Sequence, residues 1–230
     1  MCDGGNTVSR YVIKFSKEGT IRYISHLDLL RLFKRSFKRT GIKLEHSQGF
    51  NPHPKMSFAQ PLSLGYLSSG EYLEFDTTEA CDTNAITEKL NSVMPEGLSV
   101  IFCRELPKSG KSLAALTNAA DYEILIPLPP DLTEDVAEEI RNYVSREKIL
   151  VLKHQKKSGK DTEVDIKPMI SELNGMVNGN NIMIITKLAA GSASNLSPEL
   201  VLSTFTEFAK ISYDRAEVFI KRTEIYFQEN

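Results

Sequence analysis

The sequence predicts an α+β protein built from two ferredoxin-like halves in tandem, each with a βαββαβ order and an antiparallel sheet. Two observations lead to this class. Segments that alternate apolar and polar residues, as half-buried strands do, are separated by segments with the periodicity of helices. The order of these segments in residues 8–106 then recurs in residues 119–230, without a residue-level repeat. We therefore expect two domains with these boundaries, the second carrying an insertion.

The first half begins with a strand at 10–16, where β-forming residues alternate with polar ones, and a turn leads to a second extended piece at 21–24. A helix then starts after Ser25, whose hydroxyl is a typical N-cap, and ends at Gly41. The remaining segments are a short strand at 42–46, a loop at 47–70, a strand at 71–76, a helix at 83–93 and a strand at 98–104.

The second half follows a stretch at 106–112 whose Gly, Ser and Lys content is typical of a linker. A helical turn or two at 112–119 comes first. The segments that follow are a strand at 121–127, a helix at 133–146 capped by Thr133, strands at 148–154 and 161–167, a short helix at 168–174 after Pro168, a strand at 181–187, a helix at 197–209 and a long strand at 215–227.

The composition excludes several classes of protein. Charged residues make up 25% and apolar residues 41% of the chain, which excludes wholesale disorder. No apolar stretch approaches the roughly 20 residues of a membrane-spanning helix, and the N-terminus lacks the basic and apolar segments of a secretory signal. The odd number and wide spacing of Cys2, Cys81 and Cys103 match neither a disulfide framework nor a metal site. We expect a cytoplasmic chain with reduced thiols and no membrane contact.

Charge is distributed unevenly along the chain. The net charge is −2, yet residues 10–55 hold eleven Lys and Arg against three Asp and Glu. This segment is therefore strongly positive and the remainder is acidic. Such a division indicates one face made for an anionic partner.

The predicted first helix concentrates this charge on one side. At 100° per residue its five basic residues fall within an arc of about 140°. They are Arg31, Lys34, Arg35, Lys38 and Arg39, and the opposite side holds His26, Leu29, Leu30, Leu32, Phe33 and Phe37. Five like charges on one face repel each other, so the pattern favours an anion-binding surface, with nucleic acid as the expected anion. Five phosphate contacts would give a log–log salt slope of roughly −3.5 to −4.5. The alternative is a solvated face rich in helix-forming residues.

The loop at 47–59 is stiffened by Pro52 and Pro54, which fix their own φ and bias the preceding residues toward extended backbone. A stiff loop loses little entropy on binding. Aromatic and amide side chains in it have the chemistry to stack on unpaired RNA bases and to contact base edges. The candidate residues are Phe50, Asn51, His53 and Lys55. The alternative is a packed surface turn with Phe50 and Phe58 in the core.

A dense series of residues between positions 24 and 71 carries a resemblance to a known family. The residues are Ile24-Ser25-His26-Leu27-Asp28, Arg31, Gly49-Phe50-Asn51-Pro52-His53-Pro54-Lys55, Ser57-Phe58-Ala59, Leu62, Gly65 and Glu71, followed more thinly by Val164-Asp165-Ile166-Lys167-Pro168 and Arg222-Thr223-Glu224. In these stretches the chain resembles the radical-SAM-linked proteins. That family has a domain of unknown function encoded beside, or fused to, a radical S-adenosylmethionine (radical SAM) protein in bacteria, often near a ribonuclease of the E/G type. At the place of Lys167 the family more often has Arg.

The resemblance implies a radical SAM protein as partner and an RNA-related pathway. The chain itself has no CxxxCxxC motif, whose three thiolates hold the radical SAM cluster. The cluster would therefore belong to the partner.

Three of the four histidines, His26, His46 and His53, lie within 28 residues, and imidazole is a natural general acid or base. The order of elements is similar to that of the repeat-RNA-processing endonucleases of CRISPR systems, in which a helix-borne histidine assists attack by a 2′-hydroxyl. His26 is the candidate here. Its place on the apolar side of the helix instead favours a packed histidine hydrogen-bonded to a neighbour. Asp28 could complete a metal site with His46 and His53, but no short spacing forces them together, and we expect no metal.

Residues 190–199 form a small-residue loop before a helix capped by Ser197. Backbone amides at such a terminus can hold a phosphate, and the candidate phosphate-binding residues are Gly191, Ser192 and Ser194. A well-capped helix with Glu199 in its first turn has the same pattern without a ligand. The chain has no P-loop, no GxGxxG after a strand and no Ser-His-Asp signature, which disfavours nucleotide hydrolysis and dinucleotide redox chemistry. No cofactor is expected.

The function favoured by these observations is an RNA-binding accessory protein that works with a radical SAM enzyme in tRNA or rRNA modification or processing. One alternative is a metal-independent RNA-processing endonuclease or RNA-modifying enzyme that uses His26 as general acid or base. Another is a protein-docking module without nucleic acid contact. No catalytic motif decides for an enzyme, and the sequence sets no oligomeric state.

Overall fold

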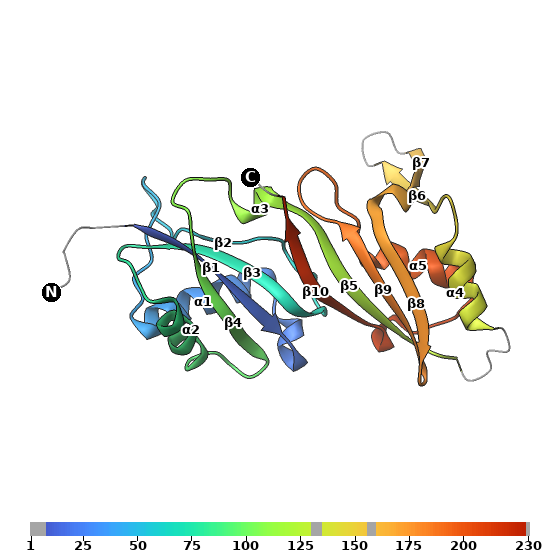
Figure 1. Cartoon of the computed structure of the whole chain (residues 1–230), viewed down its shortest axis with the longest axis horizontal. Coiled ribbons are helices and arrows are strands. Elements are labelled where there is room, and N and C mark those ends of the chain that lie inside the picture. The colour runs from blue at the N-terminus through green and yellow to red at the C-terminus, as the bar shows by residue number, and fades with distance from the viewer. Residues whose placement is uncertain (1–7, 130–134, 156–159, 229–230) are drawn as a thin grey trace. The chain divides into compact units, whose positions relative to one another are not determined.

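The computed structural model describes residues 8–129, 135–155 and 160–228 (Figure 1). Its fold is of the mixed α and β class, with mostly antiparallel strands and few helices. The chain divides into two compact units. The first is Met1–Thr117 with Glu224–Asn230, and the second is Asn118–Thr223. None of the helices in the described ranges is long and apolar enough to cross a membrane.

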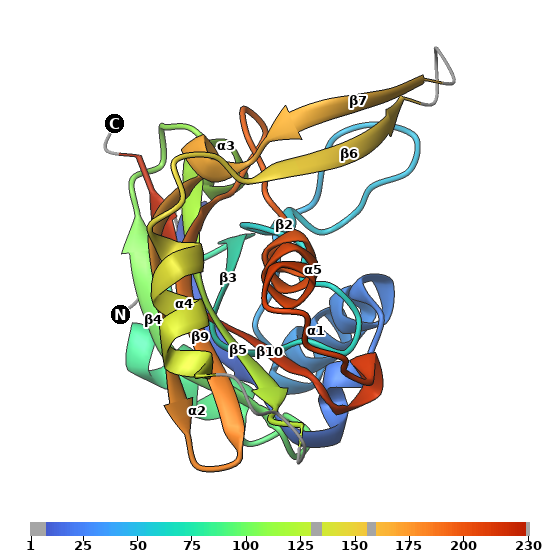
Figure 2. The ribbon, with the colours of Figure 1, turned by 90° about the vertical axis from the view of Figure 1, so that its right-hand side faces the viewer.

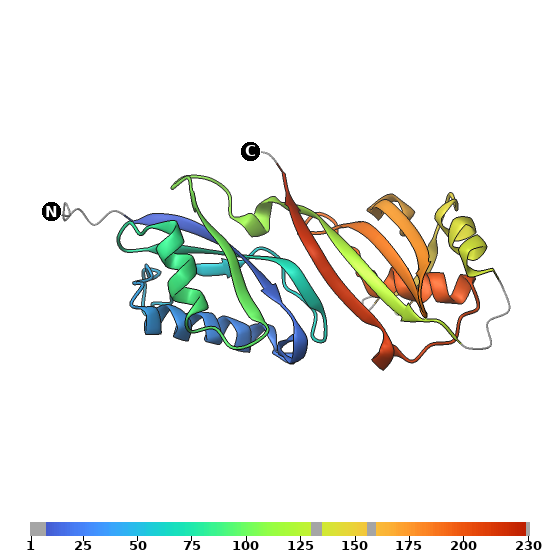
Figure 3. The ribbon, with the colours of Figure 1, turned by 60° about the horizontal axis from the view of Figure 1, so that its bottom comes forward.

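The first unit is a sheet covered by helices on one face (Figure 3). Its elements are β1 (Ser9–Lys17), the 3₁₀ helix η1 (Gly19–Tyr23), α1 (His26–Thr40), β2 (Met56–Phe58), β3 (Leu67–Thr77), α2 (Thr83–Asn91), β4 (Leu98–Leu106) and α3 (Leu113–Leu116). β1 lies between β4 and β3 and pairs antiparallel with both, and β2 pairs antiparallel with β3. The register sets Ile13 of β1 opposite Leu73 of β3 and Cys103 of β4.

The core of the first unit lies between this sheet and its two main helices. Alternate residues of β1 and β3 face the helices because successive strand residues point to opposite sides. Ile13, Phe15 and Leu73 are fully buried there, together with Phe33 of α1 and Leu90 of α2. The other face of the sheet therefore carries the polar residues of these strands.

The second unit has the strand order β10-β5-β9-β8, with β9 antiparallel to both neighbours. Its elements are β5 (Thr117–Pro127), α4 (Val136–Val144), β6 (Leu150–Gln155), β7 (Lys160–Asp165), η2 (Lys167–Met169), β8 (Ile170–Asn178), β9 (Asn181–Ala189), α5 (Pro198–Phe208), η3 (Arg215–Glu217) and β10 (Phe219–Phe227). β6 and β7 form a separate two-stranded hairpin, which extends from this unit (Figure 2). The last residues of β10, from Glu224 on, belong to the first unit.

Close packing in the second unit depends on one glycine. Tyr143 of α4 contacts Phe205 of α5, with ring centroids 5.3 Å apart. Gly175 of β8 faces the side chain of Ile140 in α4, and a Cβ at Gly175 would lie 2.7 Å from Ile140 Cγ2. The missing side chain therefore allows α4 to approach the sheet.

The structure confirms the N-cap at Ser25 and the end of α1 at Gly41, and it differs from the predicted elements in several places. Residues 21–24, predicted as extended, belong mostly to η1, whose first residue is Gly19 with a φ of 59°. Residues 42–46 form isolated bridges instead of a strand, and the predicted loop at 47–70 contains β2. The predicted helix at 168–174 is wrong.

In that last segment, the chain forms a short 3₁₀ turn and then β8, because β9 offers its backbone groups as partners. Ile170 and Leu173 are buried, so tertiary packing overrides the local preference. The predicted cap Thr133 lies outside the described residues, and α4 is capped by Asp135, whose side chain accepts from the amides of Ala137 and Glu138.

Candidate nucleic-acid interface

α1 carries the predicted basic face, and its caps and apolar stripe determine which side it exposes. The Ser25 hydroxyl accepts a hydrogen bond from a first-turn amide, and Gly41 ends the helix with a φ of 75°. Leu29, Phe33 and Phe37 are at most 5% exposed and pack against the sheet. The opposite side of α1 is therefore directed to solvent.

The five predicted cations share this solvent side. Arg31, Arg35, Lys38 and Arg39 are exposed and Lys34 is half-buried. Arg31 donates to the Asp28 carboxylate at 2.8 Å. Within the described part of the chain, no carboxylate lies within 4.0 Å of the other four cations.

Asp28 has a specific effect on this face. Its pKa lies below the ordinary value because the Ser25 hydroxyl donates to it and, second, because Arg31 does. The carboxylate is therefore anionic at neutral pH and neutralises Arg31 locally. Four cations of the five remain available to an external anion.

The neighbouring segments divide the basic face into two rows. Arg31, Arg35 and Arg39, which we call the arginine row, line a cleft of about 800 Å³ whose other wall is residues 92–95 after α2. Lys34 and Lys38 line a different groove, of about 700 Å³, beside residues 41–46. The sequence predicts one basic surface, and the structure shows two surfaces of different lining.

The proline-containing loop is closed into a small hairpin at residues 46–54, which we call the Phe50 hairpin. His46 and Pro54 form an antiparallel bridge. The Ser47 amide donates to the His53 carbonyl at 2.9 Å, and the Ser47 hydroxyl contacts His53 Nδ1 at 2.9 Å. Gly49, with a φ of 128°, makes the turn that few other residues tolerate. The tip is thereby held by hydrogen bonds at its base.

Phe50 is at the tip and is fully exposed, at 112% of its reference area. Phe58 is instead buried in the core, 5.9 Å from the rings of Phe15 and Phe33. The interpretation that both phenylalanines lie in the core is therefore wrong for Phe50. Asn51 and His53 are exposed beside it.

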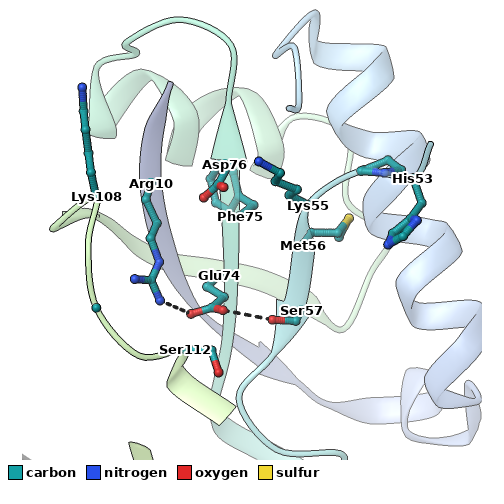
Figure 4. Close-up of a pocket in the computed structure, with 12 residues that line it drawn as sticks. Arg10, His53, Lys55, Met56, Ser57, Glu74, Phe75, Asp76, Lys108 and Ser112 are labelled. Carbon is teal, nitrogen blue, oxygen red and sulfur yellow. Dashed lines mark hydrogen bonds and ion pairs between the residues drawn. The ribbon is translucent and has the colours of Figure 1, made fainter. Parts of the chain in front are cut away.

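A cavity of about 390 Å³ is lined in part by the segment His53–Lys55 (Figure 4). Glu74 on its floor accepts from Arg10 at 2.9 Å, from the Ser57 hydroxyl at 3.1 Å and from the Leu113 amide at 2.9 Å. This carboxylate is fully engaged, which indicates a structural network.

Neighbouring Asp76 has a raised pKa because it is partly buried, an effect that Lys55 and Arg10 oppose. No pattern in the sequence singled out the residues of this network. Arg10 and Asp76 become neighbours only through the pairing of β1 with β3, so only the alternation within each strand could have indicated their shared face.

His26 is exposed, and its ring meets that of Phe58 edge-on, with centroids 5.1 Å apart. Among the described residues no hydrogen-bond partner of the His26 ring lies within 3.5 Å, so the predicted hydrogen bond to a neighbour is wrong, and the packing of the ring is its edge-on contact with Phe58. The cavity that it lines, with the buried Lys17 and Glu71, is only about 10 Å³. A nucleotide could reach His26 only from the solvent side, and its catalytic role stays a prediction.

The residues considered for a metal are not assembled into a site. His46 Nδ1 lies 3.0 Å from the Leu44 carbonyl, His53 Nδ1 contacts Ser47, and Asp28 is paired with Arg31. Throughout the described ranges, no three His, Cys, Asp or Glu side chains come together closely enough to hold a metal ion.

The candidate phosphate loop with Gly191, Ser192 and Ser194 belongs to the second unit, whereas all the other candidates belong to the first. Ser192 and Ser194 are exposed. At the start of α5 the Ser197 hydroxyl accepts from the Glu199 amide, and the Glu199 carboxylate is bound by Arg215. The helix terminus thus already has an internal anion, and phosphate binding there stays a prediction.

These features define an α+β protein with an exposed cationic helix face and a hydrogen-bonded hairpin that carries an exposed aromatic ring. The chain belongs to the family described as "uncharacterized protein conserved in bacteria (DUF2344)", which matches residues 10–198. The match confirms the bacterial family of unknown function expected from the sequence, and it carries no reference to radical SAM proteins. No curated protein is similar enough to count as a match.

Among solved structures, this chain is similar in fold to a protein chain in the crystal structure of a Cbf5-Nop10-Gar1 complex, with a TM-score of 0.51 and 12% sequence identity. That likeness covers 96% of this chain and 50% of the other, so the chain spans half the length of the protein it matches. An unknown protein from Galdieria sulphuraria also matches over 96% of this chain and 99% of its own, with 14% identity and a TM-score of 0.27.

Proposed function

We propose that the protein is an RNA-binding accessory protein that holds RNA on its first unit and presents it to a radical SAM enzyme in tRNA or rRNA modification or processing. One observation carries this proposal. Four exposed or half-exposed cations lie on α1, and no carboxylate in the described part of the chain comes within 4.0 Å of them. A face that served only solubility would mix both signs of charge.

The arginine row suits the phosphate backbone. Residues four positions apart on a helix are separated by about 6 Å along its axis, so Arg31, Arg35 and Arg39 form a row of donors, slightly inclined to the helix axis, along one cleft. Each guanidinium can bind a phosphate through two parallel hydrogen bonds. Arg31 is engaged by Asp28 and the two lysines line a different groove, so Arg35 and Arg39 make the phosphate contacts, and we expect a log–log salt slope of about −1.4 for single-stranded RNA.

The Phe50 hairpin supplies the contact that charge alone cannot make. An exposed aromatic ring at 112% of its reference area gains nothing for folding, whereas stacking of one base on it contributes about 1–3 kcal/mol. The hydrogen bonds between Ser47 and His53 hold the backbone before binding, so little further ordering is required. This arrangement favours RNA with unpaired bases.

The proposal includes the assignment of each unit as a ferredoxin-like half. In the first unit the strands lie in the order β4-β1-β3, and β2 pairs with β3. Helices follow the first and third of its strands along the chain. This is the order expected of the split βαβ arrangement. The second unit has the order β10-β5-β9-β8, with α4 and α5 at equivalent places and the β6–β7 hairpin as the insertion. These orders support tandem halves.

The radical SAM partner rests on the sequence resemblance. Its densest part, Gly49 to Lys55, forms most of the Phe50 hairpin and the segment that follows it. A solvent-exposed hairpin is more readily explained by a binding role than by folding. We place the protein in the cytoplasm, where RNA and such an enzyme would meet it.

The decisive test measures RNA retention on filters over a series of salt concentrations. Replacing Arg35 and Arg39 with Gln should reduce the slope by about 1.4. The control replaces Lys89 and Lys210, exposed residues that line neither of the two clefts beside α1, with Gln, and should leave the slope unchanged. Equal slopes for both variants would contradict the proposal.

A second experiment distinguishes the enzymatic alternative, which the solvent exposure of His26 favours. The protein is incubated with tRNA and rRNA without added metal, and the products are separated on a sequencing gel. Cleavage that disappears in His26→Ala would establish the endonuclease in place of the accessory role. We expect binding that survives this substitution and no cleavage.

A further inference from the structure

The groove beside the lysines of α1, which we call the lysine groove, has a lining unlike that of the arginine cleft. Its apolar lining residues, which we call the floor, are Phe37, Ile42, Leu44 and Pro54. Lys34, Lys38 and Lys43 also line the groove. The groove has a volume of about 700 Å³, within the range of sites that hold several side chains or a small ligand.

The groove is built on rigid parts of the first unit. Gly41 turns the chain back after α1, and the next segment is held against β3 by the bridge Leu44–Thr77 and by the Thr78 amide, which donates to the Lys43 carbonyl at 3.0 Å. Phe37 packs on Phe75 with ring centroids 4.6 Å apart. The apolar floor is therefore present before any partner binds.

The floor favours aliphatic side chains over nucleobases. A base has several polar atoms on its edges, and burying them without partners is unfavourable. Besides the lysines, the polar side chains that line the groove among the described residues are His46 and Thr78, and His46 Nδ1 already contacts the Leu44 carbonyl. Aliphatic side chains gain by leaving water and need no such partner.

The charges around the groove specify the sign of the partner. Lys34 and Lys38 have no carboxylate within 4.0 Å among the described residues. Lys43 pairs with Glu79, at 3.7 Å, and both side chains are mostly exposed. An acidic segment would therefore meet three cations around an apolar floor, and a basic segment would be repelled.

We propose that the lysine groove binds a short segment of another protein in which two or three aliphatic side chains are flanked by Asp or Glu, in the manner of an amphipathic helix in a groove. This goes beyond RNA binding, because the arginine row borders a different cleft on the same helix. RNA and a protein partner would then occupy separate surfaces of α1.

The test uses a fluorescein-labelled helical peptide with Leu at positions i, i+3, i+4 and i+7 and Glu at most of the others, with binding followed by fluorescence anisotropy. Two matched peptides replace Leu with Ser or Glu with Lys. We expect binding of the first peptide alone. Replacing Lys34 and Lys38 with Glu should weaken it by about tenfold or more.

The control variant replaces Arg35 and Arg39 with Glu, an equal change of charge on the other row, and should leave peptide binding within about twofold while it impairs RNA retention. This pairing separates failure of the docking proposal from failure of the RNA proposal. Methyl NMR signals of Ile42 and Leu44 locate the peptide without any substitution of the floor.

Four outcomes would overturn the proposal. The Ser peptide could bind as well as the Leu peptide, which would show attraction by charge alone. The methyl signals of Ile42 and Leu44 could stay unmoved at saturation. An RNA oligonucleotide could move them and displace the peptide, which would make the groove part of the RNA site. Sedimentation could show a dimer that Lys34→Glu with Lys38→Glu dissociates, which would make a second copy the occupant.

Discussion

Replacing Phe50 with Ala separates a binding role from a folding role at one position. The side chain is 112% exposed, so its removal takes no apolar area out of the core, and we expect the free energy of unfolding to change by less than about 0.5 kcal/mol. Loss of one stacked base should weaken RNA binding by about 1–3 kcal/mol, which corresponds to roughly 5- to 150-fold in Kd. The salt slope should not change, because no charge is removed.

The matched control is Phe58→Ala. Phe58 is 8% exposed and lies among Phe15 and Phe33, so its truncation should cost about 3–5 kcal/mol of stability. Urea denaturation measures both stabilities, and filter retention of a single-stranded RNA measures both affinities. The conservative variant Phe50→Trp should retain binding. If Phe50→Ala destabilised the fold as Phe58→Ala does, or left RNA affinity unchanged, the reasoning about the hairpin would be refuted.

Three further predictions concern packing and titration. Gly175→Ala should lower the free energy of unfolding by about 1–3 kcal/mol, because the new Cβ would lie 2.7 Å from Ile140 Cγ2; urea denaturation measures this, and Gly175→Ala should cost less when it is made in an Ile140→Ala background than in the unchanged protein. Burial raises the pKa of Asp76 above the ordinary value of 3.8, so the folded state favours the protonated carboxyl group. The contribution of Asp76 to the free energy of unfolding therefore becomes less favourable as the pH rises above 3.8. Asp76→Asn should therefore stabilise the protein more at pH about 7 than at pH about 3 in thermal melts, and an equal effect at both would contradict the assignment. Burial raises the pKa of the Cys103 thiol to about 12, so iodoacetamide near neutral pH should label it only in the unfolded protein, and rapid labelling of the native protein would argue against its burial.

The elements that can be predicted well from the sequence are those whose caps and apolar periodicity lie within the element or next to it. α1 is an example, because its cap at Ser25, its terminal Gly41 and its apolar stripe of Leu29, Phe33 and Phe37 are all within the helix or next to it. The segment 168–174 shows the opposite case. Its sequence is compatible with a helix after Pro168, yet Ile170 and Leu173 are buried in a strand paired with β9. No residue within or next to this segment indicates that β9 will pair with it.

The candidate site likewise has a part that the sequence predicts and a part that only the structure shows. The clustering of five cations on one side of α1 follows from helical geometry alone, and the structure places them on the exposed side. Their division into the arginine row and the lysine groove depends on residues 92–95 and 41–46, which the helical wheel does not include. The ion pair between Arg31 and Asp28 can likewise be recognised only from the positions of the side chains.

The amino-acid order by itself determined where the cationic helix begins and ends, which residues share its solvent side, and that a proline-stiffened loop follows it, because caps, periodicity and proline act over a few neighbouring residues. Only the tertiary structure decided that Phe50 is exposed while Phe58 is buried, and that the lysines border an apolar groove. Those outcomes depend on which distant strands and turns pack against each side chain, since burial is a property of the assembled core and not of the local sequence.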